Sequence, residues 1–528
     1  MKLKLKTVWD YFYGFKGLLL IFYCAFVFIT DAFVSHERGK YFIRSAFIIS
    51  LACFLLCPLL LKFTKKISFE QKDFGLTKNK KLIQLMFYAI PFLFFAMLYV
   101  IYYPGGFSAD SINQYKQAIN NSYDDWHPVF QTLFAIKLPL LLTGGWIGSI
   151  VLFQIVLLSA VLGYAFGHLF EYAGLKYSII SMVFILGNTE IWNLAIHPWK
   201  DTSFAMGALL LVVFAMNIHF SEGEWIKKPL NTIAFIVVIV LTTLFRHNAI
   251  LFTAPMLIPL FMYISKKRFI AIVLSFIVLF LGVKYPLYSA MQVEQPGSRQ
   301  VETLGLPLTI IGAVVSQDPE SLDEEVLTFA YEVAPKELWE EKFDIGSYNS
   351  IKWHEQTNNE VVEQYGTAKV LKMLVKCVKA SPKVAITSFI RLTGPMYTLT
   401  EEYLIFDVVE VVDNDLGLKL SGIRPLQTQV DKLIQLIPLM LPHIFMYLGV
   451  MHLILIIAVL AKCNFKKADG WRKAMTVAPV FAYNFGTALL LTGYLDVGRF
   501  FCYTVLLFPF LLPSLFIRSK QDDEVKIK

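Results

Sequence analysis

Residues 82–106 read LIQLMFYAIPFLFFAMLYVIYYPGG, an apolar run without a charged residue that ends at Pro104-Gly105-Gly106. A helix of about 20 apolar residues is long enough to cross the hydrocarbon layer of a bilayer. Proline removes a backbone donor and glycine frees the backbone, so the helix is expected to stop here. The stretch therefore predicts a membrane-spanning helix that ends sharply.

The rest of the chain repeats this pattern. Of its 528 residues, 56% are hydrophobic and only 17% are charged, which excludes an ordinary water-soluble fold and indicates an all-α polytopic membrane protein. The net charge of +8 does not favour a nucleic-acid partner, because most lysines lie in short loops between apolar segments. We expect about 12 spans, near 14–34, 41–62, 82–102, 146–170, 178–196, 202–220, 229–245, 248–265, 269–288, 433–461, 474–493 and 499–517.

The segment 127–143 decides the topology. It is apolar enough to insert, but it begins with His127-Pro128 and contains Lys137 and Pro139. If it lies along the outer face, both chain ends and nearly all short-loop lysines are cytoplasmic, as the positive-inside rule favours, whereas a spanning segment would move several basic loops outside. The surface position also gathers the polar clusters near span ends on the outer side: 110–127, 197–201, 245–248, 295–300 and 495–499.

Three parts follow from this topology. We expect an N-terminal transmembrane module at 1–290, with an acidic first large external loop at 103–145, and C-terminal transmembrane helices with a cytoplasmic tail at 432–528. Residues 291–431 are expected to form a small, mostly helical extracytoplasmic region. Its acidic stretch 318–343 is typical of solvated amphipathic helices, and 383–397 is suited to rest on the bilayer surface.

The first external loop offers a carboxylate in a special position. Ser108 is expected to cap a helix whose first turn holds Asp110, where the helix dipole favours an anion by about 0.3–1 kcal/mol. An ionised carboxylate at the membrane surface suits a general base or a metal ligand, and a plain helix cap is the alternative. The apolar face of this helix is predicted to hold Ile112, Tyr115 and Ile119, with Gln114 and Gln117 on the other face beside Asp110.

The same loop carries further polar groups that support Asp110. Asp124, Asp125 and His127 are candidates beside Gln114, although Asp124 and Asp125 also suit a solvated loop and His127 also suits a helix cap. A divalent cation, Mg²⁺ or Mn²⁺, held by Asp110 with Asp124 or Asp125 is left open, because its ligands would all be oxygens.

Basic residues on the same face complement these acids. Lys200, Arg246, Arg299 and Arg499 lie near predicted span ends on a side that is otherwise poor in lysine and arginine. Each alone suits an interfacial anchor that reaches water. Together, facing acids, they indicate an anionic ligand, since arginine binds phosphate through a planar fork and lysine binds it as a point charge. The same loops add His197, Asp201 and His247 as further candidates.

Three short motifs, PGGFSAD (104–110), DWHPVF (125–130) and HPWKD (197–201), give the chain a family resemblance. The chain resembles the GT-C superfamily of membrane glycosyltransferases, which use polyprenyl-phosphate sugars, and is most similar to an uncharacterised bacterial branch of it. The resemblance implies that Asp110 is the catalytic base of an inverting transfer and that Arg499 lies near the donor phosphate.

The resemblance also implies a polyprenyl-phosphate-sugar donor, an acceptor such as a cell-surface glycopolymer or glycolipid, and a bacterial plasma membrane with an extracytoplasmic active face. The chain departs from the family pattern in two respects. Two spans precede the one that leads into the acidic loop, and the second acid is an Asp-Asp pair before His127, which leaves metal dependence open.

Two other classes of function remain as alternatives. A lipid or polysaccharide transporter or flippase would use ionisable residues near or within spans, for which Glu190, Asp496 and Arg499 are candidates. An acyl- or phospho-group transferase acting on a wall polymer would need a nucleophile, for which His127 or His197 is a candidate.

Overall fold

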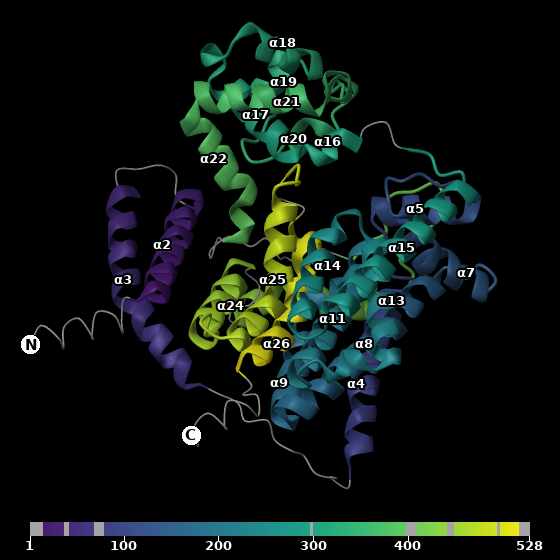
Figure 1. Ribbon diagram of the computed structural model, residues 1–528. Coiled ribbons are helices and arrows are strands. Elements are labelled where there is room, and N and C mark those ends of the chain that lie inside the picture. The colour runs from purple at the N-terminus through teal and green to yellow at the C-terminus, as the bar shows by residue number, and fades with distance from the viewer. Residues whose placement is uncertain are drawn as a thin grey trace, which may run out of the picture.

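The computed structural model describes residues 14–35, 42–67, 79–295, 299–397, 409–440, 448–493 and 497–516. Within these ranges the regular elements are helices, and the β-bridges are isolated. The helices form a long bundle with a smaller group of helices at one end (Figure 1). The all-α fold predicted from the apolar runs is confirmed.

Five of the described helices are long and apolar enough to cross a membrane. They are α4 (Lys80–Ile101), α8 (Gly148–Ala173), α11 (Lys200–Phe220), α15 (Lys266–Ala290) and α26 (Val497–Phe516). Two further helices meet the same criterion only as a pair bent by 69°, which would make a sixth span. They are α9 (Leu175–Leu186) and α10 (Thr189–Ile196). These helices support a membrane-embedded protein, and the larger number of spans stays a prediction.

Burial separates the centre of the bundle from its surface. α11 lies at the centre, because 89% of the residues in its apolar 18-residue stretch are buried inside the protein. Gly207 of α11 allows close packing, since a Cβ there would overlap Thr242 of α13 (Pro229–Phe245). In α15 only 11% of the residues in the corresponding 18-residue stretch are buried, and side chains such as Leu274 and Val278 are exposed. Apolar surface of this kind is suited to lipid. The other bundle helices are α2 (Phe15–Ser35), α3 (Phe42–Lys66), α13 (Pro229–Phe245), α14 (Ile250–Leu257), α24 (Leu448–Lys462) and α25 (Ala468–Ala488).

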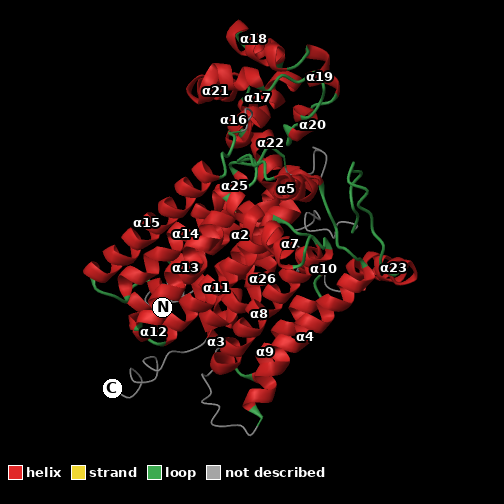
Figure 2. Cartoon of the chain, turned by 90° about the vertical axis from the view of Figure 1, so that its right-hand side faces the viewer, coloured by secondary structure: helices red, strands yellow, loops and turns green. Residues whose placement is uncertain are grey.

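The two ends of the bundle carry different charges. Figure 2 shows α12 (Glu224–Lys227) at the end that lies away from α5 (Ala109–Asn120). The same far end holds Lys80 and Lys266, at which α4 and α15 begin. Basic helix ends therefore gather opposite α5, as the charge pattern predicts. Which end faces the cytoplasm stays a prediction.

The ambiguous segment 127–143 is a short helix with a π-helical turn in its middle. It consists of α6 (Val129–Gln131), η1 (Thr132–Lys137) and α7 (Leu138–Leu142). At 1.5 Å per residue it is about 20 Å long, which is shorter than the hydrocarbon layer of about 30 Å. The Lys137 ammonium donates to the Ala118 carbonyl over 2.6 Å, which ties the segment to α5. This geometry supports a helix along the surface.

The helices between Arg299 and Thr393 form a separate group, which we call the cap unit (α16–α22). They surround a core of their own that contains Val314, Phe329 and Trp339, and Figure 1 shows them beyond the end of the bundle, with α22 leading back to it. The acidic stretch 318–343 is helical in α18 and α19, as expected. The cap helices are α16 (Arg299–Thr303), α17 (Gly305–Gln317), α18 (Glu324–Val333), α19 (Lys336–Glu341), α20 (Asn349–Lys352), α21 (Glu360–Ala380) and α22 (Pro382–Thr393).

Residues 409–423, which we call the return segment, are irregular chain with a turn at 415–416. It pairs with the backbone that follows α4: the Phe107 N–H donates to the Glu410 carbonyl over 2.9 Å, and the Val412 N–H donates to the Phe107 carbonyl over 3.0 Å. The span predicted at 433–461 is divided between α23 (Arg424–Met440) and α24, and residues 441–447 between them lie outside the described ranges.

Candidate functional site

Two glycines shape the loop that leads from α4 to Asp110. Gly105 has a φ of +112°, and a Cβ there would lie 2.6 Å from a Val151 methyl and 2.7 Å from the Ile196 carbonyl oxygen. A Cβ at Gly106 would overlap the His197 imidazole. Only glycine allows the backbone to approach α8 and the end of α10 this closely. The Pro-Gly-Gly exit seen in the sequence thus fixes where α5 begins.

The start of α5 agrees with the prediction. Ser108 is its N-cap, and the Ser108 hydroxyl accepts the Ser111 N–H. The Trp199 indole N–H also donates to the Ser108 hydroxyl over 3.1 Å, which ties the cap to the loop before α11. Asp110 lies in the first turn of α5, as expected. Its carboxylate is therefore placed by a capped helix end and not by a mobile loop.

The buried face of α5 carries polar as well as apolar side chains. Gln114 is 1% exposed, and its amide donates to Gln131 over 2.5 Å and to Thr132 over 2.8 Å. On the apolar face, Ile112 is 6% exposed but Ile119 is 41% exposed. The polar residue Gln114 is buried because α5 packs against a segment that offers polar groups at the contact. Gln114 therefore fastens α5 in place and does not belong to the site.

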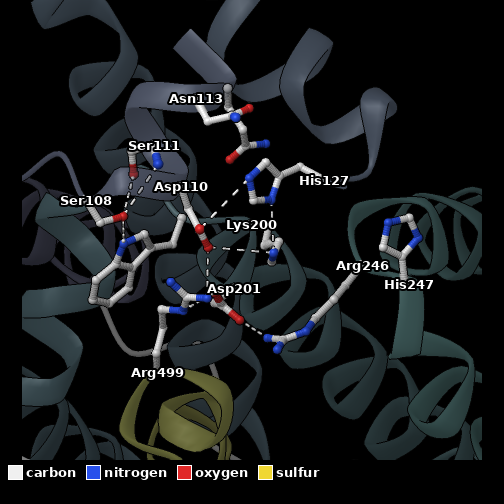
Figure 3. A network of polar contacts seen from close by, with 12 residues as sticks. Ser108, Asp110, Ser111, Asn113, His127, Lys200, Asp201, Arg246, His247 and Arg499 are labelled. Carbon is white, nitrogen blue, oxygen red and sulfur yellow. Dashed lines mark hydrogen bonds and ion pairs between the residues drawn. The ribbon is translucent and has the colours of Figure 1, made fainter. Parts of the chain in front are cut away.

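Asp110 lies among three nitrogen groups from three other elements (Figure 3). Its carboxylate is 2.9 Å from the guanidinium of Arg499 in α26 and 3.8 Å from the ammonium of Lys200 in α11. The His127 Nε2 lies 4.0 Å away. These residues are far apart in the sequence, and the structure brings them together as the polar clusters predicted.

Asp201 links the two arginines behind Asp110. Its carboxylate pairs with the Arg246 guanidinium and lies 3.4 Å from the Arg499 Nε. The side chains of Asp201 and Arg246 are 3% and 4% exposed, so each needs the other's charge to offset the cost of leaving water. The Arg246 Nε also donates to Asn248 over 2.9 Å. Arg246 is therefore held behind the site, while Arg499, at 23% exposed, faces the open side.

The charges fix the protonation of Asp110 and His127. Burial disfavours the charged form of Asp110, but the charges of Arg499 and Lys200 outweigh it and hold the pKa of this carboxyl well below its usual range. Burial, helped by the charge of Lys200, lowers the pKa of His127 to about 3. His127 is thus neutral near pH 7, and its Nδ1 accepts from the Lys200 ammonium over 3.1 Å. Its Nε2 then carries the proton and faces Asp110.

The network opens into a cavity of about 600 Å³ between the bundle and the cap unit. We call its charged base the floor, formed by Asp110, Lys200, Arg246 and Arg499. We call the opposite lining the roof, formed by Trp126, Glu302, Thr303, Asn349, Lys352 and Trp353. Apolar side chains from α14, the turn after α25 and α26 also line the cavity, namely Ile250, Leu251, Leu490, Leu491 and Phe500. The cavity therefore combines a cationic base with an apolar wall.

The two acids of the Asp-Asp pair have different places. Asp125 lines the cavity, accepts from the Tyr288 hydroxyl over 2.6 Å and lies 3.5 Å from the His247 Nε2. His247 lines the cavity as well. Asp124 accepts the Trp126 N–H over 2.9 Å and is not part of the lining. Asp125 and His247 thus belong to the site, whereas Asp124 shapes the loop beside it.

Other predicted residues lie elsewhere. His197 is 3% exposed, stacks on Trp199 with ring centroids 4.4 Å apart, and does not line the cavity. Arg299 begins α16, but its side chain lies outside the described part of the structure. Glu190 is buried in α10, and Asp496 lies outside the described residues.

Sequence reasoning missed several members of the lining. Trp126 and Asn248 lie in segments 125–130 and 245–248, which were selected because of other residues in them. Their position next to those charged residues could have identified them as part of the site. Glu302, Lys352 and Trp353 gave no such signal, because they lie in the cap unit, whose position over the floor depends on packing between distant segments.

The predicted metal site stays untested. Asp110 faces Arg499 and Lys200, and Asp125 faces His247 and Tyr288. Within the described ranges, no three His, Cys, Asp or Glu side chains gather closely enough to hold a metal ion. The cationic side chains of Arg499 and Lys200 already lie against the Asp110 oxygens that a divalent ion would need, so we assign no step to a metal.

Comparison with known protein families, curated proteins and solved structures finds no significant match to this chain. The chemistry of the site must therefore be argued from its own residues.

Proposed function

We propose that the chain is a membrane glycosyltransferase that moves a sugar from a polyprenyl-phosphate donor to a hydroxyl of an extracytoplasmic acceptor, a cell-surface glycopolymer or glycolipid. The observation that carries this proposal is the pairing of an ionised carboxylate, Asp110, with a surplus of cations beside an apolar wall. Among the described residues of the floor together with Asp201, three cations (Lys200, Arg246 and Arg499) face two carboxylates, Asp110 and Asp201.

The donor phosphate suits the floor. Arg499 and Lys200 are the partly exposed cations, with side chains 23% and 15% exposed. A phosphate that accepts from both would remove the surplus positive charge, since charge-assisted hydrogen bonds to phosphate are stronger than neutral ones. The polyprenyl chain suits the apolar wall near Leu251 of α14 and Leu490, which follows the end of α25. Arg246 keeps Asp201 and Arg499 in position.

The transfer follows from these positions. Once phosphate takes over Arg499 and Lys200, Asp110 loses its closest partners, and its affinity for a proton rises. Asp110 then accepts the proton of the acceptor hydroxyl, whose oxygen attacks the anomeric carbon. The bond from that carbon to the phosphate oxygen breaks, the electron pair leaves with the phosphate, and Arg499 and Lys200 stabilise the developing charge. The configuration at the anomeric carbon inverts.

A binding experiment tests the donor assignment. The purified full-length protein in lipid nanodiscs is mixed with polyprenyl monophosphate or with the corresponding polyprenol, and the bound lipid is measured by native mass spectrometry. We expect retention of the phosphate and little retention of the alcohol. Equal retention of both lipids would contradict the proposal, because the floor would then contribute no recognition.

Sugar transfer is measured with the same preparation, by following labelled sugar from a polyprenyl-phosphate-sugar donor into a cell-envelope extract. Movement of the intact donor across a sealed bilayer without transfer would favour the transporter alternative. A covalent intermediate on His127 would favour group transfer through a nucleophile. Twelve spans, the N-in and C-in topology and the bacterial plasma membrane belong to the same proposal.

A further inference from the structure

Two tryptophans from separate parts of the chain meet in the roof. Trp126 lies in the loop before His127, and Trp353 follows α20 in the cap unit. Their ring centroids are 5.9 Å apart in an edge-to-face arrangement. Trp353 is 66% exposed, which is unusual for the largest apolar side chain, and both rings line the cavity that contains Asp110. An exposed aromatic surface is therefore directed at the site.

A buried lysine holds this pair in place. The Lys352 side chain is 5% exposed and forms an ion pair with Glu302. Its ammonium lies 4.5 Å from the centroid of the Trp353 ring and 6.0 Å from that of Trp126. Cations attract aromatic faces at such distances. Lys352 thus fixes both rings, and its charge is already matched by Glu302.

The roof and the floor differ in charge. The floor has a cationic surplus, whereas Lys352 and Glu302 balance each other in the roof. The rest of the roof consists of the two tryptophans and of uncharged polar side chains, Thr303 and Asn349. A ligand of the roof should therefore be neutral, carry hydroxyl groups and present an apolar face to an aromatic ring. Sugar rings have this combination of properties.

We infer that the roof is the binding subsite for the acceptor, and that it takes a neutral saccharide whose ring lies against Trp353 and Trp126. This inference rests on the proposed function, because the word acceptor assumes that the protein transfers a sugar. It places the acceptor ring against the roof, with its hydroxyls toward the floor, where Asp110 and the donor phosphate lie. Trp126 immediately precedes His127, whose Nε2 lies 4.0 Å from Asp110, so a saccharide on this ring is next to the reacting groups.

Saccharide binding to the full-length protein in nanodiscs tests the inference. The probes are three neutral disaccharides (maltose, cellobiose and N,N'-diacetylchitobiose), with glucuronic acid as the anionic comparison, and binding is measured by saturation-transfer NMR. We expect at least one neutral disaccharide to bind more tightly than glucuronic acid. Trp353→Ala should weaken that binding about tenfold, and Trp353→Phe should restore part of it.

Trp146→Ala is the matched control, because the Trp146 side chain is exposed too, at 42%, but does not line the cavity. It should leave saccharide binding unchanged, and Trp353→Ala should leave the binding of polyprenyl monophosphate unchanged. The inference is overturned if no neutral disaccharide binds, if glucuronic acid binds more tightly, or if Trp353→Ala binds the disaccharides like the unmodified protein. Loss of lipid-phosphate recognition with intact saccharide binding would count against the donor assignment alone.

Discussion

Replacing Asp110 by asparagine should have opposite effects on turnover and on donor affinity. Asparagine caps helices about as well as aspartate, so α5 should still begin at Ser108. The change removes the proton acceptor, and turnover should fall about 10²–10⁴-fold. It also removes the negative charge that lies 2.9 Å from the Arg499 guanidinium. Asp110 pairs with Arg499 in the ligand-free protein, so a donor phosphate that binds must compete with it for this guanidinium.

The size of the gain in affinity follows from the geometry. Two anions that share one guanidinium are about 5 Å apart and repel each other by about 3 kcal/mol at an effective dielectric constant of 20. The Asp110 side chain is 30% exposed, so solvent screening reduces the repulsion to about 1–2 kcal/mol. Asp110→Asn should therefore bind polyprenyl monophosphate about 5–30-fold more tightly.

The assay combines two measurements on the same purified protein. Sugar transfer is followed from a polyprenyl-phosphate-sugar donor, and lipid-phosphate affinity is measured by titration in nanodiscs. Asp124→Asn is the control, because Asp124 accepts only a loop N–H and lies outside the cavity lining. Near-normal sugar transfer by Asp110→Asn would show that Asp110 is only a helix-capping residue and not the catalytic base. Weaker lipid-phosphate binding would refute the competition between carboxylate and phosphate.

Three further predictions concern the same site and the topology. Arg499→Ala should weaken lipid-phosphate binding by about 1.5–3 kcal/mol, since it removes a charge-assisted contact, and unchanged affinity would sink that assignment. The pKa of His127 is lowered to about 3, so its contribution to stability is present above pH 6.5 and is lost as the pH falls toward 3. Between pH 7 and pH 5 the loss should be about 2 kcal/mol, and unfolding of His127→Gln should lack this part of the pH dependence. Cysteines introduced at Asn121 and Asn358 should react with an impermeant reagent in intact cells, whereas labelling only after permeabilisation would overturn the outer-face topology.

The local features of the site were accessible from the sequence. Pro104-Gly105-Gly106 indicated a helix end, and Ser108 indicated the next helix start, because both depend on backbone chemistry within a few residues. Arg499 and Lys200 were found because charges at the ends of apolar segments stand out against their surroundings. These predictions needed no knowledge of long-range packing.

Features that depend on long-range packing were not accessible. Asp201 was a candidate from its motif, but only the folded chain places it between Arg246 and Arg499. The burial of Gln114 reverses the usual rule for an amphipathic helix, because its partners on 129–142 are polar at the contact. The roof could not be predicted either, since the position of the cap unit depends on how it packs against the bundle.

The pairing of Phe107 with the return segment has a consequence for biosynthesis. Its backbone partners, Glu410 and Val412, are made about 300 residues after it. At about 5–20 residues per second, the ribosome needs roughly 15–60 s to reach them. Until then the N–H and C=O of Phe107 lack these two backbone partners. A nascent chain therefore completes this pairing only after the whole cap unit has been synthesised.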